Sequence, residues 1–158
     1  MRVVHVNCIR DRRRRIGHAL LNAWPTLSDV ASAVRNAGAD VAVVQSSYAD
    51  LHLERDGVHY QFVAEPDFLG PTASAVVPWL IARAARSWKP DVIHLNGLGF
   101  PVQCRWLSRS GCPVLVQDHA SRVRRQYAAF HRWGLSKIAG VSFTAFDQAM
   151  EFREAGYS

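Results

Sequence analysis

His119 is the residue whose type and position are best suited to chemistry. It follows a short apolar run, Asp118 precedes it, and Ser121 and Arg122 come soon after it. Imidazole titrates near neutral pH, so it commonly serves as a general acid or base. An arginine beside it binds phosphate or sugar hydroxyl groups well. We therefore predict a catalytic role for His119 and ligand binding by Asp118, Ser121 and Arg122.

A purely structural interpretation of these residues stays open. Asp118 could cap the next turn instead of orienting His119. The basic cluster that starts at Arg122 could be the solvated start of a helix. The position of His119, directly after a predicted strand, is what favours the functional interpretation.

Asn96 and Gly97 form a second polar segment at the end of a predicted strand, because they follow the apolar run at residues 92–95. In an open parallel sheet, ligands bind outside the carboxyl ends of the strands. Asn96, Gly97 and His119 are therefore predicted to line one edge of a sheet. His5 and His94 lie inside predicted strands, where we interpret them as hydrogen-bonded core groups.

An arginine run follows the first predicted strand, and the formal net charge of the chain is +6. Arginine favours bidentate contact with phosphate. We predict a phosphate or membrane contact for four residues, while a solvated charge run is the alternative. These residues are Arg12, Arg13, Arg14 and Arg15. Nucleic acid is not an expected partner, because no aromatic-lined strand accompanies the run.

The composition is that of one globular domain. The chain has 158 residues, and 49% of them are hydrophobic. No apolar run reaches the roughly 18 residues that a membrane span requires, and no secretory pattern is present. The cysteines Cys8, Cys104 and Cys112 lack zinc-site spacing, so we expect free thiols, no metal and a reducing cytoplasm.

Apolar runs and helical periodicity predict an α/β fold. We expect a Rossmann-like, doubly wound parallel sheet of about six strands with helices on both faces. The predicted strands cover residues 3–8, 41–45, 58–64, 92–95, 114–117 and 140–143. Residues 46–57 are predicted to be a loop. Thr26 with Asp29, and Thr144 with Asp147, have capping-box spacing at the starts of two predicted helices.

Three common active-site fingerprints are missing from the sequence. It contains no G-x-G-x-x-G after the first strand, no G-x-x-x-x-G-K-[ST] and no G-x-S-x-G. Classical dinucleotide binding, P-loop nucleotide hydrolysis and serine hydrolysis by a nucleophile elbow are therefore not expected.

Four short segments carry a resemblance to a known family. They are Ala-Gly-Ala-Asp-Val-Ala-Val-Val at 37–44, Lys-Pro-Asp-Val-Ile-His-Leu-Asn-Gly at 89–97, Pro-Val-Leu-Val-Gln-Asp-His at 113–119 and Gly-Val-Ser-Phe-Thr at 140–144. Together with the order of the elements, they resemble the N-terminal, acceptor-side domain of family 4 glycosyltransferases, which have the two-domain GT-B fold. The resemblance spans nearly the whole chain and rests on element order more than on one diagnostic motif.

The resemblance implies transfer of a sugar from a nucleotide-diphosphate donor to a small-molecule or lipid-linked acceptor. Such transfer usually proceeds with retention and without a metal or other cofactor. It places His119 against the transferring sugar and Gly17, in the loop after the first strand, near the donor diphosphate. The chain departs from the family in having a single Gly17 within an arginine-rich loop and Asn96 where a second histidine is common.

The 158 residues match one domain of that family, so we expect the donor-binding C-terminal domain to be absent from them. Alone, the domain is expected to be inactive and to expose a cleft face that favours self-association. A location at the inner face of the membrane is compatible with this interpretation. Two alternatives stay open: half of a GT-B-like sugar-nucleotide epimerase, and a non-enzymatic basic module that docks on anionic membrane.

Overall fold

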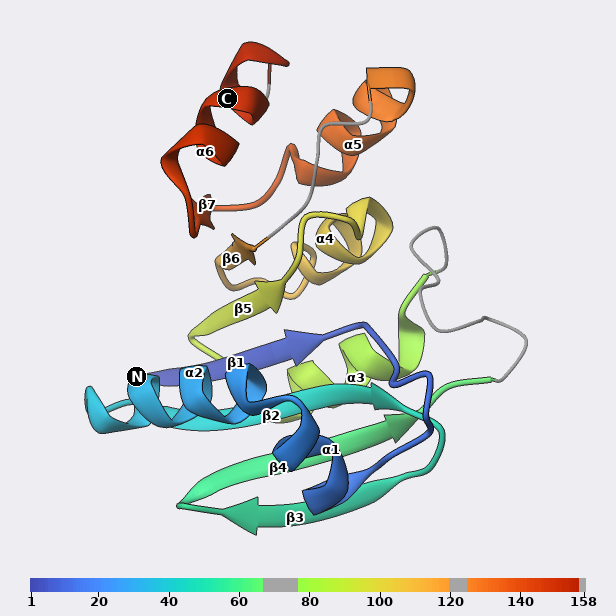
Figure 1. Ribbon diagram of the computed structural model, residues 1–158, viewed down its shortest axis with the longest axis vertical. Coiled ribbons are helices and arrows are strands. Elements are labelled where there is room, and N and C mark those ends of the chain that lie inside the picture. The colour runs from blue at the N-terminus through green and yellow to red at the C-terminus, as the bar shows by residue number, and fades with distance from the viewer. Residues whose placement is uncertain (67–76, 120–124, 157–158) are drawn as a thin grey trace.

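A computed structural model describes residues 1–66, 77–119 and 125–156. One sheet organises them, with strand order β3-β4-β2-β1-β5-β6-β7 (Figure 1). Its strands are β1 (Arg2–Asn7), β2 (Asp40–Ser47), β3 (Leu51–Arg55), β4 (Val58–Ala64), β5 (Val92–Asn96), β6 (Val114–Asp118) and β7 (Gly140–Phe143). The described helices are α1 (Gly17–Ala23), α2 (Pro25–Asn36), α3 (Trp79–Ser87), α4 (Pro101–Leu107), the 3-10 turn η2 (Arg125–Tyr127), α5 (Ala128–Leu135) and α6 (Phe146–Glu154).

The sheet confirms the predicted Rossmann-like α/β class. Every neighbouring pair is parallel except β3 with β4. The order reverses at β1, with β2 on one side and β5 on the other, as in doubly wound folds. The six predicted strands all form. Buried apolar runs explain β1 and β2, which are covered on both faces.

The prediction of a loop at residues 46–57 is wrong, because β3 forms there. Leu51 and Leu53 are half-buried and alternate with exposed His52 and Glu54. This alternation suits an antiparallel edge strand with one solvated face. Asp56 and Gly57 take positive φ angles of 53° and 70°, which is the backbone of a tight hairpin turn into β4.

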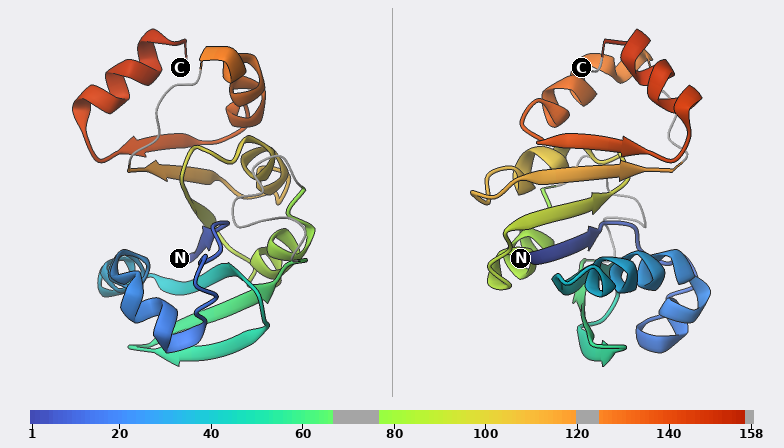
Figure 2. Two further views of the ribbon diagram at one scale, coloured as in Figure 1. Left: turned by 45° about the vertical axis from the view of Figure 1, so that its right-hand side comes forward. Right: turned by 90° about the vertical axis from the view of Figure 1, so that its left-hand side faces the viewer.

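Helices cover both faces of the sheet, as predicted (Figure 2). On one face α1 and α2 pack on β2 and β4, and Leu20, Leu27 and Tyr60 belong to that core cluster. On the other face a larger cluster joins α3 and α4 to β1, β5 and β6. In the described part of the chain, none of the helices is long and apolar enough to cross a membrane.

Both predicted capping boxes are wrong. The N-cap of α2 is Trp24, which leaves Thr26 inside the first turn, and no side chain caps the helix. The N-cap of α6 is Ala145, again without a side-chain bond. Pro25 explains the first case, because proline at the first helical position fixes φ and shifts the start of the helix toward the N-terminus.

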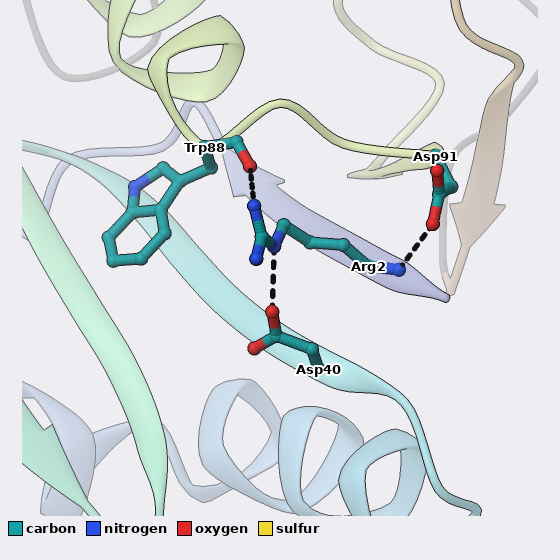
Figure 3. Close-up of polar contacts among 4 residues, drawn as sticks. All are labelled: Arg2, Asp40, Trp88 and Asp91. Carbon is teal, nitrogen blue, oxygen red and sulfur yellow. Dashed lines mark hydrogen bonds and ion pairs between the residues drawn. The ribbon is translucent and has the colours of Figure 1, made fainter.

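The amino edge of the sheet is tied together by Arg2 (Figure 3). Its Nε lies 2.7 Å from Asp40 Oδ2, and its Nη1 donates to the Trp88 carbonyl at 2.8 Å. Its backbone N–H donates to Asp91 Oδ2 at 2.7 Å. These contacts join β1, β2 and the segment before β5, so Arg2 holds the amino edge of the sheet together.

Candidate functional site

A row of polar side chains lies near the carboxyl edge, on the face of the sheet that α2 covers. His5 of β1 pairs in register with His94 of β5, and Asn96 pairs with Gln117 of β6. Side chains alternate along strands, so residues two apart share a face. The pleat therefore places polar groups from three neighbouring strands side by side.

A pocket opens over this row. It is a half-open depression, and the space of about 210 Å³ within it includes open solvent. Its lining residues are His5, Thr26, Leu27, Val30, Asn96, Gln117 and His119. The strands supply a polar floor, while the first turns of α2 supply a hydroxyl and two aliphatic side chains. The structure thus brings together Asn96 and His119, which the sequence predicted as site residues.

His5 and His94 form a hydrogen-bonded pair in the floor. Their Nδ1 atoms lie 2.8 Å apart, so one ring donates and the other accepts. Burial, helped by His94 and then His119, lowers the pKa of His5 to about 3. Burial and then His119 also lower the pKa of His94. Both rings are therefore neutral hydrogen-bonding groups at physiological pH.

His119 stands at the mouth of this pocket with an exposed side chain. Its backbone carbonyl accepts a hydrogen bond from Thr144 Oγ1 at 3.3 Å, which ties the end of β6 to the start of α6. The described residues hold no group of three or more histidine, cysteine, aspartate or glutamate side chains arranged to bind a metal ion. The chemistry of the pocket is thus that of neutral hydrogen-bonding groups with one exposed imidazole.

Asp118 is 1% exposed, and hydrogen bonds of its carboxylate hold the segments around the pocket in place. Its Oδ1 accepts the Leu98 backbone N–H at 2.8 Å, and its Oδ2 accepts from Gln148 Nε2 of α6. Gly97 supports the same turn with φ of 94°, and its N–H donates to the Gln117 carbonyl at 2.7 Å. Of the other predicted residues, Ser121 and Arg122 lie outside the described part of the chain.

Gly17 lies away from the pocket lining. It begins α1 with φ of 57°, and a Cβ there would come within 2.8 Å of Leu51 Cδ2 in β3. Glycine is favoured at this position because an L side chain would be strained at that φ and the Leu51 side chain would have to shift. The structure thus shows a packing role for Gly17, and its predicted donor contact stays a prediction.

The arginine run is partly built into the fold. Arg10 is 2% exposed and donates to the carbonyls of Glu65 and Pro66 at 3.1 and 3.3 Å. Arg15 pairs with Asp11 at 2.7 Å. Hydrogen bonding from Arg15 lowers the pKa of the Asp11 carboxyl to about 2.

The remaining arginines of the run differ in their surroundings. Arg14 lies over the Tyr48 ring at 4.6 Å from its centroid, and Arg10 approaches the same ring at 4.7 Å. Arg12, Arg13 and Arg14 all have exposed side chains. The predicted phosphate or membrane contact therefore stays a prediction for these three residues, of which Arg14 also contacts Tyr48.

Buried amides fix the strand ends beside this loop. Asn7 Nδ2 donates to Gln45 Oε1 at 2.8 Å. Gln45 Nε2 in turn donates to the Ile9 carbonyl at 2.6 Å. Both side chains are at most 2% exposed, so their bonds satisfy buried polar groups and hold the loop after β1 in place.

The cysteines take no part in the pocket. Cys8 and Cys104 are buried, Cys112 is half-buried, and all three are free, as predicted. Burial raises the pKa of the Cys104 thiol to about 12 and also raises that of Cys8. Neither thiol is a nucleophile at neutral pH, because the thiolate is the reactive form.

Sequence reasoning missed three polar members of the pocket lining, His5, Thr26 and Gln117, and the two aliphatic ones, Leu27 and Val30. The available signal was the alternation of polar residues within apolar strands, in which His5 shares a face with the residues two positions away. For Thr26 no local signal exists, because it reaches the pocket only through the packing of α2 on the sheet.

Comparison with protein families gives one match. A family model described as a glycosyl transferase 4-like domain matches residues 23–158. No curated protein matches the chain. The matched region includes every strand except β1 and every residue of the pocket lining except His5.

Proposed function

The chain belongs to the family of glycosyl transferase 4-like domains, and we propose that it is the acceptor-binding domain of a retaining glycosyltransferase. In this proposal the enzyme moves a sugar from a nucleotide-diphosphate donor to an acceptor that carries hydroxyl groups. The donor nucleotide is bound mainly by a second domain. The 158-residue domain alone binds the acceptor and transfers nothing.

The observation that carries the proposal is the neutral polar pocket at the carboxyl edge. Sugar hydroxyls have no charge to pair with, so uncharged donors and acceptors suit them. The carboxamides of Asn96 and Gln117 each donate and accept hydrogen bonds, and the lowered pKa of His5 keeps its imidazole neutral. Leu27 and Val30 provide an apolar wall for the C–H face of a sugar ring.

His119 is the proposed contact to the transferring sugar. It lies at the mouth of the pocket, while its backbone is held by Thr144. An imidazole there can hydrogen-bond a sugar hydroxyl or the oxygen that leaves or attacks. No metal or other cofactor is part of this proposal. The reaction is placed in the cytoplasm, where free thiols such as Cys8 and Cys104 persist.

Acceptor binding can be tested on the domain itself. With histidine side chains labelled for NMR, methyl glycosides should shift the imidazole signals of His5 and His119, whereas nucleotide diphosphates should not. Asn96→Ala and Gln117→Ala should each weaken glycoside binding by roughly 3- to 10-fold, the worth of one neutral hydrogen bond. His52→Ala, on the exposed side of β3, is the matched control and should bind like the native domain.

Transfer can be tested on the complete polypeptide that the gene encodes. His119→Ala should lower acceptor-dependent release of nucleotide diphosphate by roughly 100-fold or more, the usual contribution of a general acid or base. Full activity in that variant would contradict the role of His119. Nucleotide release that does not depend on acceptor would favour the sugar-nucleotide epimerase alternative.

A further inference from the structure

The sequence between Asp91 and Asp147 is strongly biased in charge. It contains a single acidic residue, Asp118, which is buried and hydrogen-bonded. The same stretch contains seven basic residues: Arg105, Arg109, Arg122, Arg124, Arg125, Arg132 and Lys137. The positive charge of the molecule is therefore concentrated on the elements that follow β5, among them α4 and α5.

Exposed aromatic side chains lie among these charges on α5. Phe130 and Trp133 are 41% and 46% exposed, and their rings stack at 5.7 Å with an interplanar angle of 11°. Tyr127, just before the helix, is 48% exposed. Large aromatics with this exposure do not belong to the core of the fold, and because they lie together they form a candidate contact surface.

Direct contacts join the aromatics of α5 to the cations of α4, which lies beside it (Figure 1). The Arg105 guanidinium lies 5.7 Å from the Trp133 ring centroid, and its Nη1 donates to Ser136 Oγ at 3.1 Å. Arg109 lies 5.2 Å from the ring centroid of Trp106. Arg105, Arg109, Phe130, Trp133 and Lys137 together are called the α4–α5 surface.

After α5, the next acidic residues along the chain are on α6. Arg132 Nη1 donates to the Ala155 carbonyl at 3.4 Å, so the end of α6 borders α5 on one side. Asp147, Glu151 and Glu154 belong to that helix. Among the described residues, no carboxylate forms an ion pair with the cations of the α4–α5 surface.

We propose that the α4–α5 surface docks the domain on an anionic membrane. Lysine and arginine near a negatively charged leaflet each contribute about 1 kcal/mol of binding. Tryptophan and other aromatic residues settle at the headgroup level, where their apolar bodies leave water and their polar atoms stay wet. The surface combines both, and the inference does not depend on the transferase activity.

A membrane suits the aromatic geometry better than nucleic acid does. Binding of single-stranded nucleic acid uses free aromatic faces on which bases stack. Here Phe130 and Trp133 stack on each other, and Arg105 lies over the Trp133 ring. These ring faces are therefore already occupied, whereas exposed aromatic side chains beside cations suit the headgroup region of an anionic membrane.

Vesicle flotation with the native domain tests the proposal. We expect binding to vesicles that contain phosphatidylglycerol, weaker binding at high salt, and little binding to pure phosphatidylcholine. Arg109→Ser with Lys137→Ser should weaken binding to the anionic vesicles by on the order of 25-fold, from about 1 kcal/mol per charge. Equal binding to neutral vesicles would overturn the proposal.

The matched control is Arg83→Ser with Arg86→Ser, which removes the same charge from exposed side chains of α3. That pair should leave vesicle binding within about 2-fold of native, a margin small against the loss expected from two surface charges. An equal loss in both double variants would mean that net charge alone drives binding, and would overturn the assignment to α4–α5. Tighter binding to a mixed-sequence oligonucleotide than to anionic vesicles would do so as well.

The aromatic half of the surface has its own test. Brominated lipid should quench the Trp133 fluorescence, and Trp133→Phe should abolish that part of the quenching while preserving the fold. Phe130→Ser with Trp133→Ser should remove the binding that survives high salt. Trp79→Ser is the control, because Trp79 is 59% exposed on a different helix. Unchanged high-salt binding in the aromatic double variant, or absence of quenching, would contradict insertion at this surface.

Discussion

At the scale of single residues, His5 couples the pocket to the stability of the fold. Its pKa is lowered from 6.5 to about 3, first by burial. Between those pH values His5 binds a proton in the unfolded chain but stays neutral in the folded domain. The free energy of unfolding therefore carries the full contribution of His5 above about pH 6.5. That contribution is lost as the pH falls toward 3, by up to about 1.4 kcal/mol per pH unit.

Urea unfolding at a series of pH values between neutrality and pH 5 measures this effect. We expect His5→Asn to flatten the acid loss of the unfolding free energy, because asparagine keeps a hydrogen-bonding group and does not titrate. Part of the pH dependence of the unfolding free energy should remain in this variant, because the pKa of His94 is also lowered in the folded domain. His52→Ala should keep the full slope, and an unchanged slope in His5→Asn would contradict the neutral buried pair.

Site residues could be predicted from the sequence where a polar residue follows an apolar strand. Asn96 and His119 were found in this way and both line the pocket. His5 and His94 were predicted to be hydrogen-bonded core groups, and they do bond each other. What the sequence could not indicate is that one of them also opens to the pocket, because this depends on the pairing of β1 with β5, about ninety residues apart along the chain.

At the scale of elements, α4 and α5 approach each other closely at Gly134. A Cβ on Gly134 would lie 2.4 Å from both Cβ and the carbonyl oxygen of Pro101. Gly134→Ala should therefore destabilise the domain by about 1–3 kcal/mol through overpacking, even though alanine favours helix over glycine by about 1 kcal/mol.

Chemical denaturation with Trp fluorescence measures this change. Gly99→Ala is the control, because a Cβ at Gly99 meets nothing within 4 Å and its φ is not positive. That variant should unfold close to the native midpoint. A native-like midpoint for Gly134→Ala would show that α5 can move away from Pro101 at no cost.

Elements were predictable where burial alone determines them. Continuous β-branched runs gave all the central parallel strands, since both faces of such strands are covered. The helix α1 was missed because it follows the arginine run, has only seven residues and lacks a side-chain cap. It is helical because Leu20 and Leu21 pack against the sheet, which is a tertiary contact and not a local propensity.

At the scale of the whole molecule, the faces of the sheet are covered unequally. On β6, Leu115 is 43% exposed, whereas Val114 and Val116 on the opposite face are at most 1% exposed. Self-association through such an exposed face stays a prediction. The basic α4–α5 surface lies on helices at the well-covered face, so pocket and membrane surface need not compete for the same side chains.

The two core clusters share β2, and this determines how the molecule should unfold. Val41 and Val43 belong to the cluster beneath α1 and α2, while Ala42 and Val44 belong to the cluster beneath α3 and α4. Alternate residues of β2 pack into the two clusters. If one cluster unfolds and β2 leaves the sheet, the other cluster loses its packing as well. We expect a single cooperative transition, as in most domains of this size.

NMR of the protein labelled with fluorotryptophan can test whether the two clusters unfold together. Trp24 packs on one cluster and Trp106 on the other, so each signal reports on one cluster. Both native signals should disappear at the same urea concentration. Leu20→Ala and Leu107→Ala, one in each cluster, should each cost about 2–5 kcal/mol and shift both signals together. If Leu20→Ala moved only the Trp24 transition, the α1–α2 layer would be an independent unit and the pocket between α2 and the strands could open without global unfolding.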